Sequence, residues 1–224
     1  MSNRSAPAPT SAAAMYRALV GIGSICALLI VTAYLLTAPA IARNRAELLQ
    51  QAIFAVLPGA ETVQPMRRDA GGTIGPAAPG EEAAFHLGLD AGNRVVGVAI
   101  EASGMGYQDL IGLIYGYSPA RGQLTGMRVL ASRETPGLGD KIITDPVFVG
   151  SFAGLAVPLS QDGARVAHAV EAVPAGKRSQ PWQFDAITGA TISSRAVAGI
   201  ITASTAQWAP LLHAQAGRLE GDTP

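Results

Sequence analysis

Cysteine and histidine are scarce in this 224-residue chain, which contains one cysteine and three histidines. The single cysteine, Cys26, cannot form an intramolecular disulfide or build a cysteine-ligated zinc or iron–sulfur site. His86, His168 and His213 lie far apart, without the close spacings typical of metal ligands. The sequence also contains no G-x-S-x-G, H-E-x-x-H or Walker loop. We therefore expect neither a metal site nor a nucleophile activated by a base.

Charged residues are also few, at 14% of the chain compared with about 25% in an average soluble domain. A deficit of this size indicates a segment that does not contact water. The net charge is zero, but the first 45 residues contain four arginines and no acidic residue. The remaining residues, 12 basic and 16 acidic, carry a net charge of about −4, which argues against binding to nucleic acid.

The charge deficit is explained by an apolar segment near the N-terminus. Residues 18–42 contain no charged residue and would span about 37 Å as a helix, enough to cross a hydrocarbon core of about 30 Å. We predict a disordered cytoplasmic tail over residues 1–15 and a transmembrane helix over residues 16–42. The alternative is a cleaved signal peptide, because residues 38–40 (Ala-Pro-Ala) resemble a cleavage site. The apolar segment is, however, longer than the 7–15 residues of a typical signal.

The charges that flank this segment predict its orientation. The amino group of Met1, together with Arg4 and Arg17, precedes it, whereas the two arginines that follow it are offset by Glu47. This small positive bias predicts a cytoplasmic N-terminus and a C-terminal domain outside the cytoplasm.

The remainder of the chain predicts an α+β domain with mainly antiparallel strands and flanking helices. A juxtamembrane helix is expected over residues 43–60, where apolar residues recur at spacings of three and four before Pro58-Gly59. Alternating or continuous apolar runs predict strands at residues 85–89, 95–100, 110–117 and 127–131, a loop at 71–80, and a helix at about 193–208. Residues 147–155 fit either a short helix or a strand. Grouped strands with helices at the ends favour one α+β domain over residues 61–210, followed by a tail over residues 211–224.

Small hydroxyl residues and a glycine precede the last predicted helix, in the segment DAITGATISSRAV at residues 185–197. One interpretation is a helix N-cap, in which Thr191 or Ser193 accepts a hydrogen bond from an amide of the first turn. The other is a phosphate site, since the same amides and the helix dipole attract an anion and Arg195 could offset its charge.

A second segment, ETPGLGDKI at residues 134–142, follows the strand predicted at 127–131. Pro136-Gly137 is typical of a type II turn, because proline fixes φ and glycine supplies a positive φ. The segment is therefore either a plain connecting turn or an apolar shelf against which a flat ring packs.

Together, these two segments resemble the FMN-binding domain shared by the G subunit of the Rnf electron-transport complex and the C subunit of the sodium-pumping NADH:quinone reductase. In that family a D-x-x-[ST]-G-A-T-x-[ST] motif is the target of a periplasmic flavin transferase, which joins the phosphate of FMN to the final threonine of G-A-T. The resemblance implies covalent FMN on Thr191. The rest of the motif is Asp185, Thr188, Gly189, Ala190 and Ser193, of which Asp185 is expected to serve recognition by the transferase. Further flavin contacts are implied at Glu134, Thr135, Leu138, Gly139, Tyr107 and, with no local motif around it, Lys177.

The resemblance implies an electron-carrying component of an ion pump that links ferredoxin and NAD. Its implied partners are the other membrane subunits of that complex, including a second one with covalent FMN, and the flavin transferase. Its implied location is the bacterial inner membrane, with one transmembrane helix and the flavin domain in the periplasm. Gly-Asp-Lys at residues 139–141 resembles the Rnf protein more than the quinone-reductase protein.

Three further functions stay open on the sequence alone. The chain could be a component of the quinone reductase that resembles its C subunit, or a separate membrane-anchored flavin reductase. It could also be a non-catalytic anchor in which the T-G-A-T sequence only caps a helix.

Overall fold

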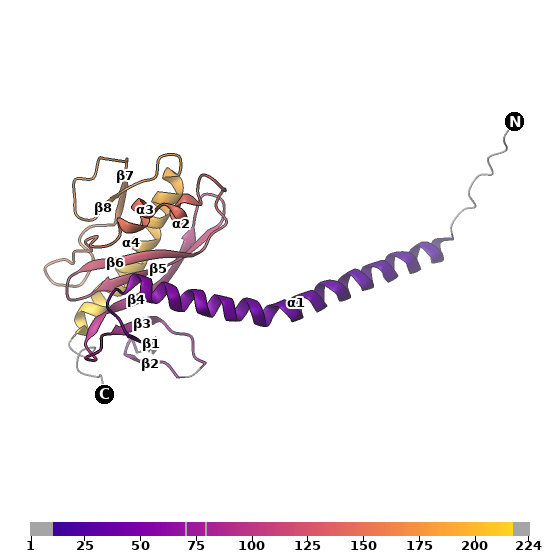
Figure 1. Cartoon of the computed structure of the whole chain (residues 1–224), viewed down its shortest axis with the longest axis horizontal. Coiled ribbons are helices and arrows are strands. Elements are labelled where there is room, and N and C mark those ends of the chain that lie inside the picture. The colour runs from indigo at the N-terminus through magenta and orange to yellow at the C-terminus, as the bar shows by residue number, and fades with distance from the viewer. Residues whose placement is uncertain (1–10, 70, 79, 217–224) are drawn as a thin grey trace. The chain divides into compact units, whose positions relative to one another are not determined.

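The computed structural model describes residues 11–69, 71–78 and 80–216, and it consists of an N-terminal helical unit up to Glu47 and a domain that starts at Leu48. Helix α1 (Ala12–Val56) runs through the first unit and ends inside the second (Figure 1). Its length and apolar composition are sufficient to cross a membrane. The predicted transmembrane and juxtamembrane helices are thus one continuous helix. Part of the predicted tail, from Ala12 onward, is helical, and residues 1–10 lie outside the described residues.

The domain is built on a six-stranded antiparallel sheet with the order β2-β1-β3-β4-β5-β6. The strands are β1 (Thr62–Arg68), β2 (Ile74–Pro76), β3 (Phe85–Leu89), β4 (Val95–Met105), β5 (Leu110–Ser118) and β6 (Gln123–Ala131). All four predicted strands are present, and β4 and β6 are longer than expected. Two strands of this sheet escaped prediction: β1, in which only Met66 is buried, and β2, which lies in the segment expected to be a loop. Neither carries the buried alternation from which strands are predicted.

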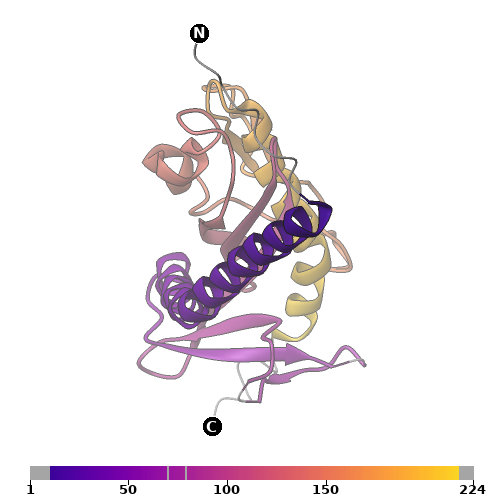
Figure 2. The same cartoon turned by 90° about the vertical axis from the view of Figure 1, so that its right-hand side faces the viewer.

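Helices cover the two faces of this sheet. Helix α4 (Thr191–Ala214) packs through Val197, Ile201 and other apolar residues on the face that presents Leu113 and Tyr115. The last turns of α1 pack on the opposite face against Ala99 and residues near it. In Figure 2, the last turns of α1 and helix α4 lie on opposite sides of the strands. Because side chains alternate along a strand, both faces are buried in the first half of β4, at residues 98–100, and over most of β5.

Glycines in the sheet leave the space into which the end of α1 packs, and we call this contact surface the seat of α1. A Cβ atom on Gly88 would lie 2.7 Å from Leu57 Cδ1, and one on Gly116 would collide with the Val56 carbonyl oxygen and Thr125 Oγ1. The Thr125 hydroxyl donates a hydrogen bond to that carbonyl, which would otherwise be one of the unsatisfied acceptors at a helix C-terminus. The end of the membrane helix is therefore fixed directly on the sheet.

The region between β6 and α4 contains short elements: α2 (Lys141–Thr144), α3 (Pro146–Gly150), and the parallel pair β7 (Glu171–Val173) and β8 (Gln183–Asp185). The ambiguous segment at 147–155 is helical at its start, where Asp145 caps α3 through hydrogen bonds from two amides. Helix α4 continues six residues beyond the predicted end at 208, and Leu212 is fully buried. Pro210 favours a helix end in the sequence, but packing keeps the helix intact through it. The predicted tail from residue 211 thus begins inside α4, and residues 217–224 lie outside the described residues.

Candidate functional site

A pocket of about 350 Å³ lies where three segments of the domain meet. They are the turn between β4 and β5, the loop over residues 134–140, and the start of α4. The lining residues are Tyr107, Glu134, Thr135, Leu138, Gly139, Gly189, Ala190, Thr191, Ile192 and Ser193. Its volume is at the lower end of the range for small-molecule sites. Nine of these ten residues are among the predicted flavin contacts, and Ile192 is the addition.

The start of α4 does not have the cap expected from the sequence. The residue before the helix is Ala190, which has no side chain able to cap it. Thr191 is exposed and its hydroxyl forms no hydrogen bond within the described part of the chain, while the Ser193 hydroxyl donates to Glu134. The N-cap interpretation is therefore wrong for both residues. The first-turn amides are left for an outside acceptor, since the first amides of any helix have no intrahelical partner.

Ser194, which was not predicted as a site residue, shapes the turn before the helix. Its hydroxyl donates to the Ala190 carbonyl at 2.9 Å and accepts from the Ile187 amide at 3.1 Å. Gly189 has a φ of +86°, a conformation that side chains rarely adopt. The turn therefore presents Gly189 and Ala190, with little side-chain bulk, next to the helix amides, an arrangement that suits a phosphate.

Apolar side chains line the outer part of the pocket. Tyr107, Leu138 and Ile192 come from the three different segments, and 65%, 51% and 56% of their respective surfaces are exposed. Exposing three large apolar side chains to water is unfavourable, and a flat aromatic ring seated on them would remove that surface from water. The pocket thus combines an apolar wall with an anion-binding helix start. These are the two surfaces that FMN requires.

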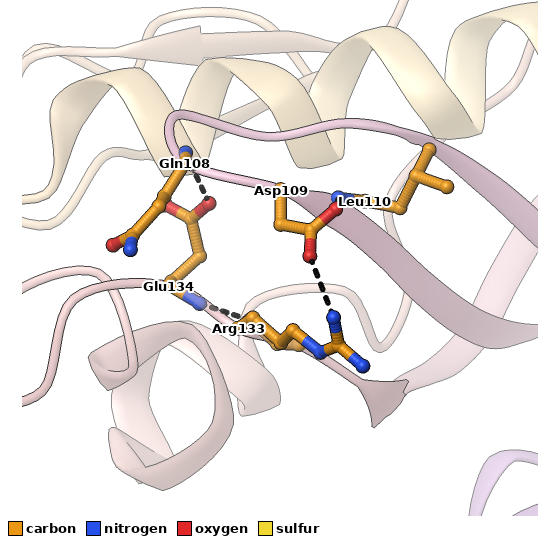
Figure 3. A network of polar contacts seen from close by, with 6 residues as sticks. Gln108, Asp109, Leu110, Arg133 and Glu134 are labelled. Carbon is orange, nitrogen blue, oxygen red and sulfur yellow. Dashed lines mark hydrogen bonds and ion pairs between the residues drawn. The ribbon is translucent and has the colours of Figure 1, made fainter. Parts of the chain in front are cut away.

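Glu134 holds the three segments together. Its side chain is buried, accepts a hydrogen bond from the Ser193 hydroxyl, and accepts another from the Gln108 amide at 3.0 Å (Figure 3). Burial acts to raise the pKa of this carboxyl, but hydrogen bonds from Ser193 and from the amides of Gln108, Tyr107 and Asp109 outweigh it. The pKa therefore lies below its ordinary value.

This lowered pKa predicts acid sensitivity. Ionised Glu134 stabilises the domain above its ordinary pKa of 4.5, and the contribution is lost as the pH falls through the lower pKa of the folded protein. We expect the free energy of unfolding to decrease more between about pH 5 and about pH 3 in the wild type than in Glu134→Gln. Urea unfolding at each pH measures this, with the exposed Glu82→Gln as control. An identical pH dependence in wild type and Glu134→Gln would contradict the assignment.

Three predicted site residues are not in the pocket lining. Thr188 and Lys177 are exposed and do not line it. Asp185 accepts a hydrogen bond from the Gly176 amide at 2.9 Å, so it holds the turn that carries Lys177. Arg195, expected to offset a phosphate charge, is exposed and forms no ion pair among the described residues.

Comparison with known proteins assigns the family. Residues 106–205 match the family described as the FMN-binding domain. The G subunit of the ion-translocating oxidoreductase complex of Methanosarcina acetivorans is 31% identical over 186 residues, covering 80% of this chain and 85% of that protein. The chain belongs to the family of these G subunits. The G subunit of Cereibacter sphaeroides is 35% identical over 188 residues, covering 82% of this chain and 78% of that protein. All ten lining residues lie within the matched FMN-binding region.

Solved structures confirm the fold. NqrC from Shewanella oneidensis superposes with a TM-score of 0.59 at 20% identity, covering 81% of this chain and all of that chain. The C subunit of the Na(+)-translocating NADH-quinone reductase from Parabacteroides distasonis superposes with a TM-score of 0.54 at 18% identity. The match covers 68% of this chain and 78% of that chain. The predicted α+β architecture, a helix followed by an antiparallel-sheet domain with helices, is thus confirmed.

Proposed function

We propose that this protein is a membrane-anchored electron carrier of an ion-translocating oxidoreductase complex, with FMN held as a phosphoester on Thr191. The observation that carries the proposal is the pocket. Its lining includes the first turn of α4, large apolar side chains, and Thr191, which is exposed and whose hydroxyl forms no hydrogen bond among the described residues. When bound, FMN supplies the redox chemistry, and the protein supplies attachment, orientation and electrostatics.

Different residues of the pocket would bind different parts of FMN. The amides of the first turn of α4, beside Gly189 and Ala190, would hold the phosphate group. Tyr107, Leu138 and Ile192 would pack against the ring. We also propose that Asp185 and Thr188 are read by the flavin transferase, and that Lys177 contacts the flavin from outside the lining.

Attachment requires a free hydroxyl, and Thr191 provides one. Thr191 Oγ1 would form the phosphoester when the flavin transferase supplies FMN from FAD. The pyrophosphate bond of FAD would break, with AMP as the leaving group and the hydroxyl proton released. The resulting diester keeps one negative charge at the helix start, which the dipole stabilises. The capping function that would compete with this chemistry is absent at Thr191.

The partners follow from the family. The M. acetivorans and C. sphaeroides relatives are subunits of ion-translocating oxidoreductase complexes, so we propose that this chain assembles with the other membrane subunits of such a complex. A second protein with covalent FMN and a periplasmic flavin transferase complete the proposed set.

In-gel flavin fluorescence tests the proposed function. Protein expressed with a flavin transferase of this family and separated on a denaturing gel should fluoresce, and protein expressed without the transferase should not. Absence of flavin absorbance from the purified protein under both conditions would contradict the proposal. The remaining function would then be the non-catalytic membrane anchor.

Topology is a separate prediction. The bias of Arg4 and Arg17 before the membrane segment predicts that the domain lies outside the cytoplasm of a bacterial inner membrane. A C-terminal alkaline phosphatase fusion should be active, and a C-terminal green fluorescent protein fusion should be dark. The opposite pair of results would overturn both the topology and a periplasmic attachment.

A further inference from the structure

Glu134 is a buried carboxylate that forms no ion pair with any of the described residues. Only 5% of its surface is exposed. Its neighbours are instead the Ser193 hydroxyl and the consecutive amides of Tyr107, Gln108 and Asp109. Hydrogen bonds of this kind stabilise the ionised form of a carboxylate, but they do not neutralise its negative charge.

The donors around Glu134 favour its ionised form. Backbone amides can only donate, so the carboxyl oxygens must accept. A protonated carboxyl would bring its own donor into a ring of donors and lose part of these bonds. The charged form is therefore the one that this site is built to hold.

The carboxylate is also fixed in position. A Cβ atom on Gly139 would lie 2.8 Å from Glu134 Cβ and Oε2, and one on Gly106 would collide with Glu134 Oε1. Both neighbouring segments therefore lie against the Glu134 side chain, and Ser193 holds it from α4. It cannot swing away from the pocket wall, to which it belongs.

We propose that Glu134 is a fixed negative charge in the wall of the flavin pocket that lowers the reduction potential of the bound FMN. This inference rests on the proposed function. Reduction adds negative charge to the flavin, and a neighbouring negative charge in a site screened little by water opposes that change. Glu134 thus lines the pocket, holds the neighbouring segments in position, and acts on the flavin through its negative charge.

Asp109, in the turn between β4 and β5 that contacts Glu134, provides a matched comparison. Its carboxylate points away from Glu134 toward Arg133 (Figure 3), with 3.4 Å between Oδ2 and Nη1. The Asp109 side chain is 39% exposed and that of its arginine partner 85% exposed. Water and the paired cation screen this charge, so its removal should have little effect on the flavin.

The test is the midpoint potential of flavin-loaded, full-length protein, measured by spectroelectrochemical titration. We expect Glu134→Gln to shift the potential to a more positive value, and Asp109→Asn to leave it at the wild-type value. A Glu134→Gln potential equal to or below that of the wild type would overturn the inference. A wild type that contains no flavin would instead refute the proposed function, so the two failures are distinguishable.

Ser193→Ala separates charge from the integrity of the network. This variant breaks one hydrogen bond of the network but keeps the Glu134 charge, so its potential should be at or below that of the wild type. A rise in Ser193→Ala would show that network integrity sets the potential, which overturns the inference even if Glu134→Gln binds no flavin. The side-chain carboxyl 13C shift of Glu134 in the wild type, in detergent, should also report an ionised group at pH 7. A protonated carboxyl would contradict the inference independently.

Discussion

Thr191→Ala should abolish covalent flavin while changing the free energy of unfolding by less than about 0.5 kcal/mol. The loss of flavin is complete because no other residue replaces the lost hydroxyl at this position. The effect on stability is small because Thr191 is exposed and caps no helix amide. An N-cap residue would have cost about 1 kcal/mol, so the structure lowers the cost that the sequence alone implied.

In-gel fluorescence and urea unfolding measure the two parts of this prediction. Thr191→Ser is the matched variant, because it keeps the nucleophile but loses the methyl group that restricts the rotamer, and we expect slower attachment. Thr188→Ser keeps its hydroxyl in the recognition motif and should load normally. Fluorescence retained in Thr191→Ala would show that the flavin is attached elsewhere.

Gly116→Ala should destabilise the domain by about 3 kcal/mol, because the added methyl group has no space in the seat of α1. It would collide with the Val56 carbonyl and with the Thr125 hydroxyl that donates to it. Relief requires the end of α1 to move off the sheet, which would also expose Leu57, now fully buried.

Gly112→Ala, on the same strand, is the control. A Cβ atom at Gly112 would lie 3.7 Å from Ala131 Cβ, an ordinary contact, so this change should stay within about 0.5 kcal/mol of the wild type. Urea unfolding midpoints of the two variants make the comparison. Equal stabilities would show that α1 is not held by the glycine seat.

The parts of the fold predicted from the sequence are those with strong local patterns. The uncharged run at 18–42 required only composition, and the predicted strands at 85–89 and 110–117 are rich in apolar residues, most of which are buried. The seat of α1 has no such local pattern. Glycine is needed at Gly88 and Gly116 only because a helix that is distant in the sequence packs against them. The last helix was predicted too short, because α4 continues through Pro210, a local helix breaker, to Ala214.

The candidate site divides in the same way. Residues of the two motifs, from 134–139 and 189–193, line one pocket, as expected from their resemblance to one known family. The function of Glu134 was not apparent, because its hydrogen bonds join Gln108 and Ser193, which lie 26 and 59 residues away from it. Ser194 was missed for a simpler reason: beside Ser193, nothing in the sequence shows which serine bonds to the preceding turn.

The mass of one tryptic peptide tests the central claim most directly. Cleavage after Arg178 and Arg195 releases residues 179–195, which contain Thr188, Thr191, Ser193 and Ser194. In protein isolated from its native membrane, this peptide should carry the added mass of FMN less one water, and fragmentation should place that mass on Thr191. An unmodified peptide, or the same mass on Thr188, Ser193 or Ser194, would contradict the account.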